Sequence, residues 1–177
     1  MESYYNGKEA TKIRILGIYQ LAGGVIGLGL IAYLLSGMDT INVWVALLLV
    51  VSVALYAFSV YCGILILKKR PEALVRSRIM QILQVFSFTI FGYTFLFCSG
   101  VYLQVGIDLT NSFDVALNAG FSSWQININS GGDRIFVAFN AVPIFLILFI
   151  NDMLKKENRE KMKLTFDKPE PDMTDGQ

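Results

Sequence analysis

The stretch Val101–Asn140, VYLQVGIDLTNSFDVALNAGFSSWQININSGGDRIFVAFN, decides the fold. It contains three runs in which apolar residues alternate with polar or small ones, and alternation with period two is typical of a half-buried β-strand. Turn-forming residues separate the runs, so the short connections predict an antiparallel meander. Three further apolar positions suggest a fourth strand. The apolar positions are Val101, Leu103, Val105, Ile107 and Leu109, then Phe113, Val115, Leu117 and Ala119, then Trp124, Ile126 and Ile128, and finally Ile135, Val137 and Phe139.

The composition of the whole chain is that of a membrane protein. Of the 177 residues, 54% are hydrophobic and 16% are charged, whereas soluble domains average about 45–50% apolar and about 25% charged residues. Between Ile15 and Leu67 the one ionised side chain is that of Asp39. This spacing leaves apolar runs of the length, about 20 residues, that crosses a bilayer.

We therefore expect an all-α membrane bundle with a β insertion. Four transmembrane helices would carry a small antiparallel sheet of three or four strands, placed outside the cytoplasm between helices 3 and 4. The predicted domains are a cytoplasmic N-terminus at 1–12, transmembrane helices 1–3 within 13–100 (spans 13–35, 41–67 and 79–100), an extracytoplasmic β-meander at 101–139, transmembrane helix 4 at 140–154, and a charged, partly disordered cytoplasmic tail at 155–177.

The boundary between the last strand and the last helix stays open at this stage. Counting from Ala141 to Leu154 gives 14 residues, which is short for a crossing, whereas counting from Ile135 gives 20. The helix therefore either takes residues from the fourth strand, or begins near Asn140 and continues past Leu154 into the charged tail. Pro143 is well placed for a first helical turn.

The distribution of basic residues predicts the orientation. Lysine and arginine are enriched in cytoplasmic loops near the ends of spans. With four spans, all but one of the 15 basic residues fall on one side of the membrane, and the exception is Arg134. Both termini are therefore expected in the cytoplasm, and the absence of cysteine and of glycosylation sequons from the outer region favours a bacterial inner membrane.

Several kinds of chemistry have no residues to carry them. The chain has no histidine, which excludes a histidine base and histidine-ligated haem. With four spans, Cys62 and Cys98 would differ in depth by roughly 20 Å, too far for a disulfide. The net charge of +1 gives no reason to expect nucleic-acid binding. No ionisable side chain lies in the middle of a span, and we find no family motif, so no catalytic, cofactor or metal residues are predicted.

Three sets of residues are candidates for interaction. Gly23 and Gly27 form a small-xxx-small pair, which suits helix packing within the chain or an oligomer seam. The third run of the sheet offers a surface with amides on one side and an indole on the other. A basic cluster between spans two and three suits anionic lipid or a soluble partner. The sheet surface is Trp124, Gln125, Asn127 and Asn129, and the basic cluster is Lys68, Lys69, Arg70, Arg76 and Arg78.

These features predict a non-enzymatic membrane protein that acts through protein–protein interaction, as a sensor, an anchor or an accessory subunit. Its expected partners are the bilayer, anionic lipid at the cytoplasmic face, and a second copy or another protein. The alternative is a homo-oligomeric channel or membrane-permeabilising effector, with polar side chains along a central path: Gln20, Ser52, Ser59, Thr94 and Asn140. A lipid enzyme is a third hypothesis, and its loose candidates are Tyr61, Gln81, Gln84 and Asp152.

Overall fold

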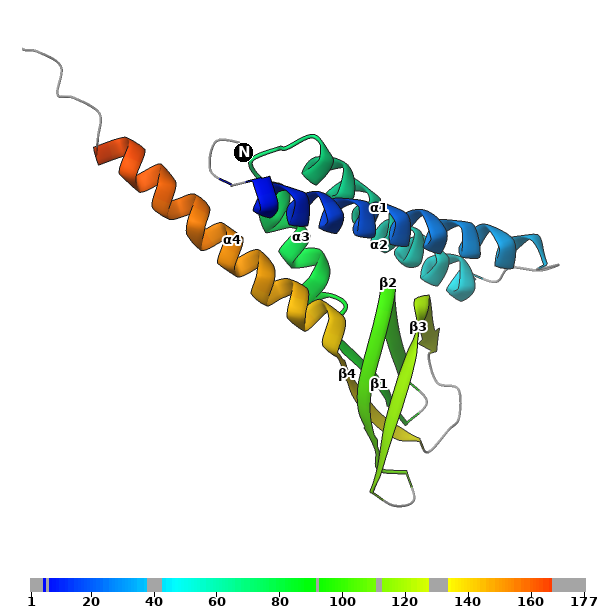
Figure 1. Ribbon diagram of the computed structural model, residues 1–177. Coiled ribbons are helices and arrows are strands. Elements are labelled where there is room, and N and C mark those ends of the chain that lie inside the picture. Colours follow the sequence, from blue (N-terminus) through cyan, green and yellow to red (C-terminus); the bar gives the residue numbers. More distant parts are fainter. Residues whose placement is uncertain are drawn as a thin grey trace, which may run out of the picture.

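A computed structural model shows four helices and a four-stranded antiparallel sheet (Figure 1). The structure describes residues 5, 7–37, 43–91, 93–110, 113–127 and 134–166. In chain order the elements are α1 (Gly7–Ser36), α2 (Val43–Leu67), α3 (Ala73–Ile82), β1 (Phe86–Ile90), β2 (Tyr93–Asp108), β3 (Asp114–Asn127), β4 (Ile135–Asn140) and α4 (Ala141–Phe166).

Helices α1 and α2 pack side by side along their length (Figure 1). Glycines let the two backbones approach: a Cβ atom on Gly63 would lie 2.7 Å from the carbonyl oxygen of Gly17. Many of their other side chains are apolar and exposed, such as Ile15 and Val50. The first two predicted helices are thus confirmed, and within the described residues α1 and α2 are the two helices long and apolar enough to cross a membrane.

The third predicted span, 79–100, is wrong as a helix. The helix α3 ends at Ile82, and the chain then continues as β1 and the first half of β2. The physical reason is visible in Phe86–Ile90, FSFTI, where aromatic and β-branched residues alternate with hydroxyl residues, a pattern that suits a pleated strand. The expected break after α2 is present, because a turn at Pro71 separates α2 from α3.

The antiparallel sheet is confirmed, but it begins at Phe86 and it is not a meander. The strand order is β1-β4-β2-β3, and β1 also pairs with the start of β2. The last strand, β4, therefore lies between β1 and the second half of β2. The predicted second and third strands are one long strand, β3. The turn-forming residues from Asn118 to Ser123, expected to separate the two, pair with β2 on both sides of a bulge at Ser122.

A bulge in the sheet makes the contact with the helices. Between Cys98 and Val101 the register of β2 against β3 shifts, and Gly100 takes a φ of 99°. The Gly100 amide donates to the Ser122 hydroxyl at 3.0 Å, and this hydroxyl donates to the Gly23 carbonyl at 3.2 Å. Because Gly23 lies near the middle of α1, the sheet meets the helix pair there and extends away from it (Figure 1).

The open boundary before the last helix is settled by Asn140. Strand β4 keeps Ile135–Asn140, and α4 begins at Ala141 and continues past Leu154 to Phe166. The Asn140 side-chain oxygen accepts hydrogen bonds from the amides of Leu103 and Val142, so it closes the strand and caps the helix. The rest of the predicted tail, 167–177, lies outside the described residues.

Candidate functional site

Basic side chains gather at one end of the helix pair, where α1 begins and α2 ends. The two ends are in contact, because a Cβ atom on Gly17 would lie 2.7 Å from the Ile66 side chain. The second half of α4 joins them through an ion pair of 2.7 Å between Lys156 and Glu9. The predicted basic cluster lies here, in the turn after α2 and on α3, and its Arg78 donates to Asn151 of α4 at 3.2 Å.

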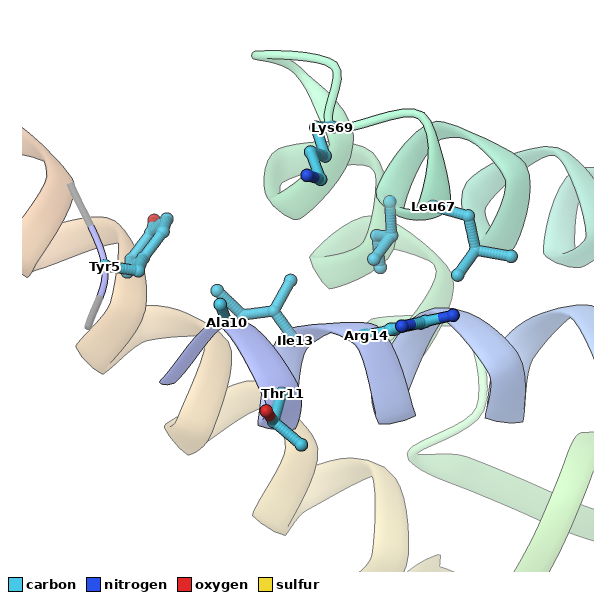
Figure 2. Close-up of a pocket in the computed structure, with 8 residues that line it drawn as sticks. Tyr5, Ala10, Thr11, Ile13, Arg14, Leu67 and Lys69 are labelled. Atoms are coloured by element: carbon cyan, nitrogen blue, oxygen red, sulfur yellow. The ribbon is translucent and has the colours of Figure 1, made fainter. Parts of the chain in front are cut away.

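A pocket of about 560 Å³ opens at this basic end (Figure 2). Arg14 and Lys69 line it together with an apolar wall, and Lys69 lies across the pocket from the first turns of α1. The sequence did not bring these residues together, although basic residues at both span ends were an available signal. The complete lining is Tyr5, Ala10, Thr11, Ile13, Arg14, Ile66, Leu67 and Lys69.

Lys69 holds an unusual backbone conformation beside this pocket. Its φ is 55°, in the left-handed region, and its amide donates to the Ile66 carbonyl at 2.9 Å. The next amide, of Arg70, donates to the Leu65 carbonyl at 3.0 Å. These two bonds form a Schellman motif, which ends a helix and favours glycine at the position that Lys69 occupies. The helix end therefore keeps a lysine where the backbone prefers a residue without a side chain.

Tyr5, which precedes α1, contacts α4. Its hydroxyl donates to the Glu157 carboxylate at 2.9 Å, and Lys161 forms an ion pair with the same carboxylate at 2.6 Å. Burial, and then the hydrogen bond to Glu157, raise the pKa of Tyr5 above its ordinary value. Hydrogen bonds to Glu9 and Asp152 likewise raise the pKa of Lys156. Both groups keep their protons at neutral pH, so the contacts that hold this end together are stable there.

The interior where sheet and helices meet is polar. Ser59 of α2 donates to the Gln20 carbonyl of α1 at 2.9 Å, and Ser99 of β2 donates to the Ser59 hydroxyl at 2.8 Å. The Ser99 amide in turn donates to the Gln84 side chain at 2.7 Å. All four residues are buried. A buried network of this kind specifies how the elements fit, since each unpaired group would cost free energy.

The inner face of the sheet continues this polar interior. Gln104 of β2 donates to the Ser87 hydroxyl of β1 at 3.1 Å, and Asn140 donates to the Cys98 sulfur at 3.5 Å. Burial raises the pKa of the Cys98 thiol to about 12, so it stays protonated. Cys98 and Cys62 are both buried free thiols.

The outer face of the sheet is apolar and exposed. The register places one apolar residue after another on this face in all four strands, and the side chain of Leu117 on β3 is 70% exposed. The polarity of the sheet is thus inverted relative to a soluble protein, in which the apolar face is covered. The outer face consists of Phe86, Phe88, Ile90, Val101, Leu103, Val105, Ile107, Val115, Leu117, Ala119, Phe121, Ile135, Val137 and Phe139.

The two edges of the β2–β3 pair differ in how their backbone groups find hydrogen-bond partners. Where β2 has no neighbouring strand, side chains complete its ladder: Gln84 accepts from the Ser99 amide, and Asn140 accepts from the Leu103 amide. The outer edge of β3 has no neighbouring strand in the described sheet. From Val115 to Phe121 this edge strand has no charged residue and no proline. Such residues usually prevent an open edge from pairing with another chain.

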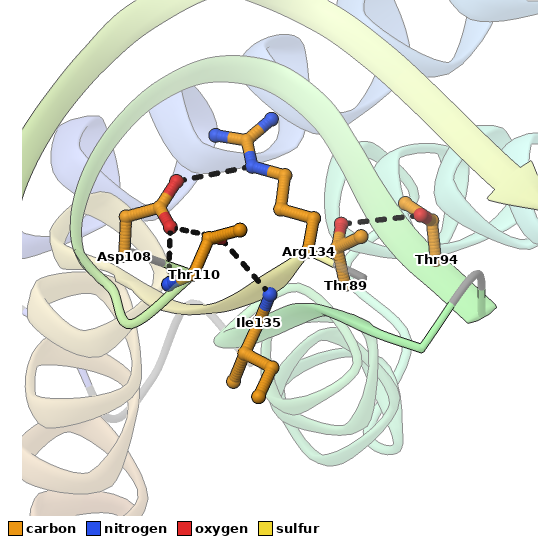
Figure 3. Close-up of polar contacts among 6 residues, drawn as sticks. All are labelled: Thr89, Thr94, Asp108, Thr110, Arg134 and Ile135. Atoms are coloured by element: carbon orange, nitrogen blue, oxygen red, sulfur yellow. Dashed lines mark hydrogen bonds and ion pairs between the residues drawn. The ribbon is translucent and has the colours of Figure 1, made fainter. Parts of the chain in front are cut away.

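The far end of the sheet is closed by a polar corner (Figure 3). Thr110 donates to the Asp108 carboxylate through both its amide and its hydroxyl, and Arg134 forms an ion pair with Asp108 at 3.1 Å. The Ile135 amide donates to the Thr110 hydroxyl at 3.2 Å, which attaches β4 to this corner. The Thr110 hydrogen bonds, with the Arg134 charge, hold the pKa of Asp108 below its ordinary value.

The predicted helix-packing residues contact other parts of the same chain. A Cβ atom on Gly23 would lie 2.6 Å from the Gly100 amide nitrogen, and one on Gly27 would overlap the Tyr56 ring.

The predicted sheet surface is divided by the structure. Trp124 is half-buried against the cluster around Tyr56 and Phe97, and Gln125 is exposed. Asn127 ends β3, and Asn129 lies outside the described residues.

The residues proposed to line a channel lie in the interior of one chain. All five are buried, and Ser59 hydrogen-bonds across elements as described above. Ser52 donates to a carbonyl of its own helix, and Thr94 donates to Thr89 in the sheet (Figure 3). A path along these side chains would require the polar interior to open. The residues named for a lipid enzyme do not converge, because Gln81 and Gln84 are buried while Tyr61 and Asp152 are exposed.

Comparison with known proteins gives no family for the chain: no family model matches the sequence, and no curated protein or solved structure matches it significantly.

Proposed function

We propose that the chain is a non-enzymatic integral membrane protein that acts by self-association, as an anchor or accessory subunit. Helices α1 and α2 cross the bilayer, and a second copy adds to the outer edge of β3. The observation that carries the proposal is this edge, which is long, apolar and unpaired next to an edge of β2 that side chains complete.

The surface polarity supports the membrane part of the proposal. The exposed residues of α1 and α2 are apolar along most of both helices, and the outer face of the sheet continues that surface. The buried residues include many amide and hydroxyl side chains, and some of them are joined by hydrogen bonds, such as Ser59 with Ser99 and Gln104 with Ser87. Lipid tails tolerate an apolar exterior, and the backbone and polar groups then have to be satisfied inside.

The charge distribution supports an orientation in a bacterial inner membrane. With α1 and α2 as the two spans, the start of α1, the end of α2 and the second half of α4, which Lys156 joins to Glu9, lie on the same side of the membrane. The segment between these helices contains no lysine or arginine. The positive-inside rule therefore places both termini in the cytoplasm. The basic end of the helix pair then lies at the cytoplasmic headgroups, where anionic lipid attracts it.

The edge of β3 argues for a second copy of this chain as its partner. Identical strands pair antiparallel about a twofold axis, so the same edge serves both partners. The outer-face residues of this part of β3 are the odd-numbered ones. If they lie opposite odd-numbered residues of the second copy, the outer faces of the two sheets form one continuous apolar surface. In lipid this pairing also supplies hydrogen bonds that the edge cannot obtain from water.

The test is the oligomeric state of the full chain in nanodiscs, measured by native mass spectrometry. The unchanged protein is expected to be a dimer, and Leu117→Lys on the edge strand is expected to give monomers. Val105→Lys is the matched control, because Val105 faces Leu117 on the same surface but lies on β2, between β3 and β4. A monomeric unchanged protein, or equal loss of dimer in both variants, contradicts edge pairing.

A second pair of variants tests the backbone itself. Amides of neighbouring residues in a strand point to opposite edges. One of Asn118→Pro and Ala119→Pro therefore removes only an outward donor and leaves the β2–β3 ladder complete. That variant, identified by an unchanged melting temperature, is expected to be monomeric, and a dimer there would overturn the proposal.

A further inference from the structure

We infer that ordered water binds inside the protein between α1 and α3, held by the side chains of Gln20, Ser77 and Gln81. This inference goes beyond the proposed function and does not depend on it, because the site lies in the interior of one chain. It assigns a ligand to three buried side chains that the hydrogen-bond networks described above do not include.

Five buried side-chain atoms have no hydrogen-bond partner among the residues that the structure describes. They are the Nε2 and Oε1 atoms of Gln20, the hydroxyl oxygen of Ser77, and the Nε2 and Oε1 atoms of Gln81. Gln20 is 1% exposed, and Ser77 and Gln81 are both 0% exposed. Buried polar groups are nearly always paired with protein or with ordered water, because an unpaired group costs free energy. A small hydrogen-bonding ligand is therefore expected at these atoms.

On α1, Gln20 lies between an apolar layer and the sheet. Leu16, one turn earlier, belongs to an apolar cluster that also contains Leu74 of α3 and Ile150 of α4. Gly23, about one turn later, closely approaches the backbone of β2 at the bulge. Because residues three and four apart share one face of a helix, Gln20 lies on the same inward face as these two neighbours.

The two polar residues of α3 lie in the same layer. Ser77 and Gln81 stand between the residues of α3 that join the apolar cluster and Gln84, which bonds to β2 at the bulge. Their face of α3 lies between the side of Arg78, which contacts α4, and the side of Met80, which packs with α2. The apolar cluster contains residues of all four helices, so α1 closes the space that this face meets.

The donors and acceptors of this layer match water. The two amides offer N–H donors and carbonyl acceptors, and the serine hydroxyl does both. A cation would leave the amide N–H groups unpaired, and an anion would leave the carbonyl oxygens unpaired. Water donates and accepts, and forms about three hydrogen bonds when it is buried. The backbones of α1 and α3 stay more than 8 Å apart along most of their length, which leaves room for such a ligand between them.

The experiment is a double-variant cycle on the full chain in nanodiscs, with the melting temperature as the measurement. Gln20→Leu and Gln81→Leu are each expected to lower it by about 2–4 °C, because each leaves the water and the other amide short of a partner. The double variant is expected to melt within about 2 °C of the unchanged protein, since an apolar pair needs no water. Gln84→Leu is the matched control. Gln84 bonds directly to the Ser99 amide, so its loss is expected to add to that of Gln20→Leu.

A crystal structure of the unchanged protein, at a resolution that shows ordered solvent, is the second measurement and does not depend on whether the variants fold. Density within hydrogen-bond distance of the Gln20 and Gln81 amides is expected. Three results would overturn the inference: a higher melting temperature in each single variant, which indicates dry amides; additive effects of the two glutamine variants; or a direct bond between the two amides without density beside them. A melting temperature that rises in sodium chloride but not in choline chloride of equal ionic strength would assign the density to a cation, and would overturn the water assignment.

Discussion

The hydroxyl oxygens of Ser59 and Ser99 lie 2.8 Å apart, although they belong to a helix and a strand separated by 40 residues. Ser59 also donates to the Gln20 carbonyl, so one small group connects α1, α2 and β2. The contact is fully buried, and it fixes where the sheet meets the helix pair.

This contact predicts energetic coupling between the two serines. Ser59→Ala and Ser99→Ala are each expected to lower the free energy of unfolding by about 1–2 kcal/mol, because each leaves a buried partner without its hydrogen bond. The double variant is expected to lose less than the sum, with a coupling of about 0.5–1.5 kcal/mol. Denaturant unfolding in detergent measures the cycle, and strict additivity would show that the serines act independently.

The close approach of α1 to the sheet predicts that two glycines of one helix respond in opposite ways. Gly23→Ala is expected to destabilise the protein by about 1–3 kcal/mol, since the new methyl group meets the backbone of Ser99 and Gly100. Gly29→Ala is the matched control, because a Cβ atom there meets nothing within 4 Å. It is expected to be neutral or to stabilise by about 0.5–1 kcal/mol through helix propensity. Thermal unfolding of the two variants checks both signs, and an equal response would mean that Gly23 does not contact β2.

The polar corner of the sheet predicts a pH-dependent stability. The folded-state pKa of Asp108 is lowered by Thr110 and Arg134, so its ionised form contributes stability above the ordinary aspartate pKa of about 4. This contribution is lost as the pH falls through the lowered value. Asp108→Asn is therefore expected to melt at a lower temperature than the unchanged protein at pH 7, and the difference is expected to shrink below about pH 4. Melting curves between pH 3 and pH 7 test this, with Asp114→Asn as the control for an acidic residue at the same end of the sheet; a difference that is constant with pH would contradict it.

The sequence predicted an element correctly where the period of its apolar residues and the length of its apolar run indicated the same kind of secondary structure. Helices α1 and α2 contain long apolar runs without a charged residue, and the alternation after Val101 predicted strands, although the last of its runs could also have joined the final helix. The prediction for the region from Ile79 to Gly100 was wrong, because the length and hydropathy of the region indicated a membrane span while the short run FSFTI indicated a strand. In a run this apolar, periodicity cannot distinguish a buried helix from a buried strand. The pairing of β1 with β4 shows that it is a strand.

The candidate site was less accessible from the sequence. The basic residues of the pocket were visible, but their convergence depends on the packing of α1 against α2 and on the contact of Tyr5 with α4. The left-handed backbone at Lys69 has no sequence signature, since the motif usually has glycine there. The open edge of β3 could not be inferred either, because a meander would have placed β4 beside it.

The position of β4 also determines when the sheet can be completed during synthesis. Strands β1, β2 and β3 leave the ribosome first, and β2 and β3 can pair with each other once residue 127 has been made. The gap between β1 and the second half of β2 is filled only when Ile135–Asn140 has been made. Until then Ser87 and Gln104 lack the strand between them, and the nascent chain carries open edges on both sides of the hairpin. A chain that stops before Ile135 is therefore a ready template for strand pairing with its neighbours, and membrane insertion of α1 and α2 keeps such intermediates attached to the membrane while α4 is still to come.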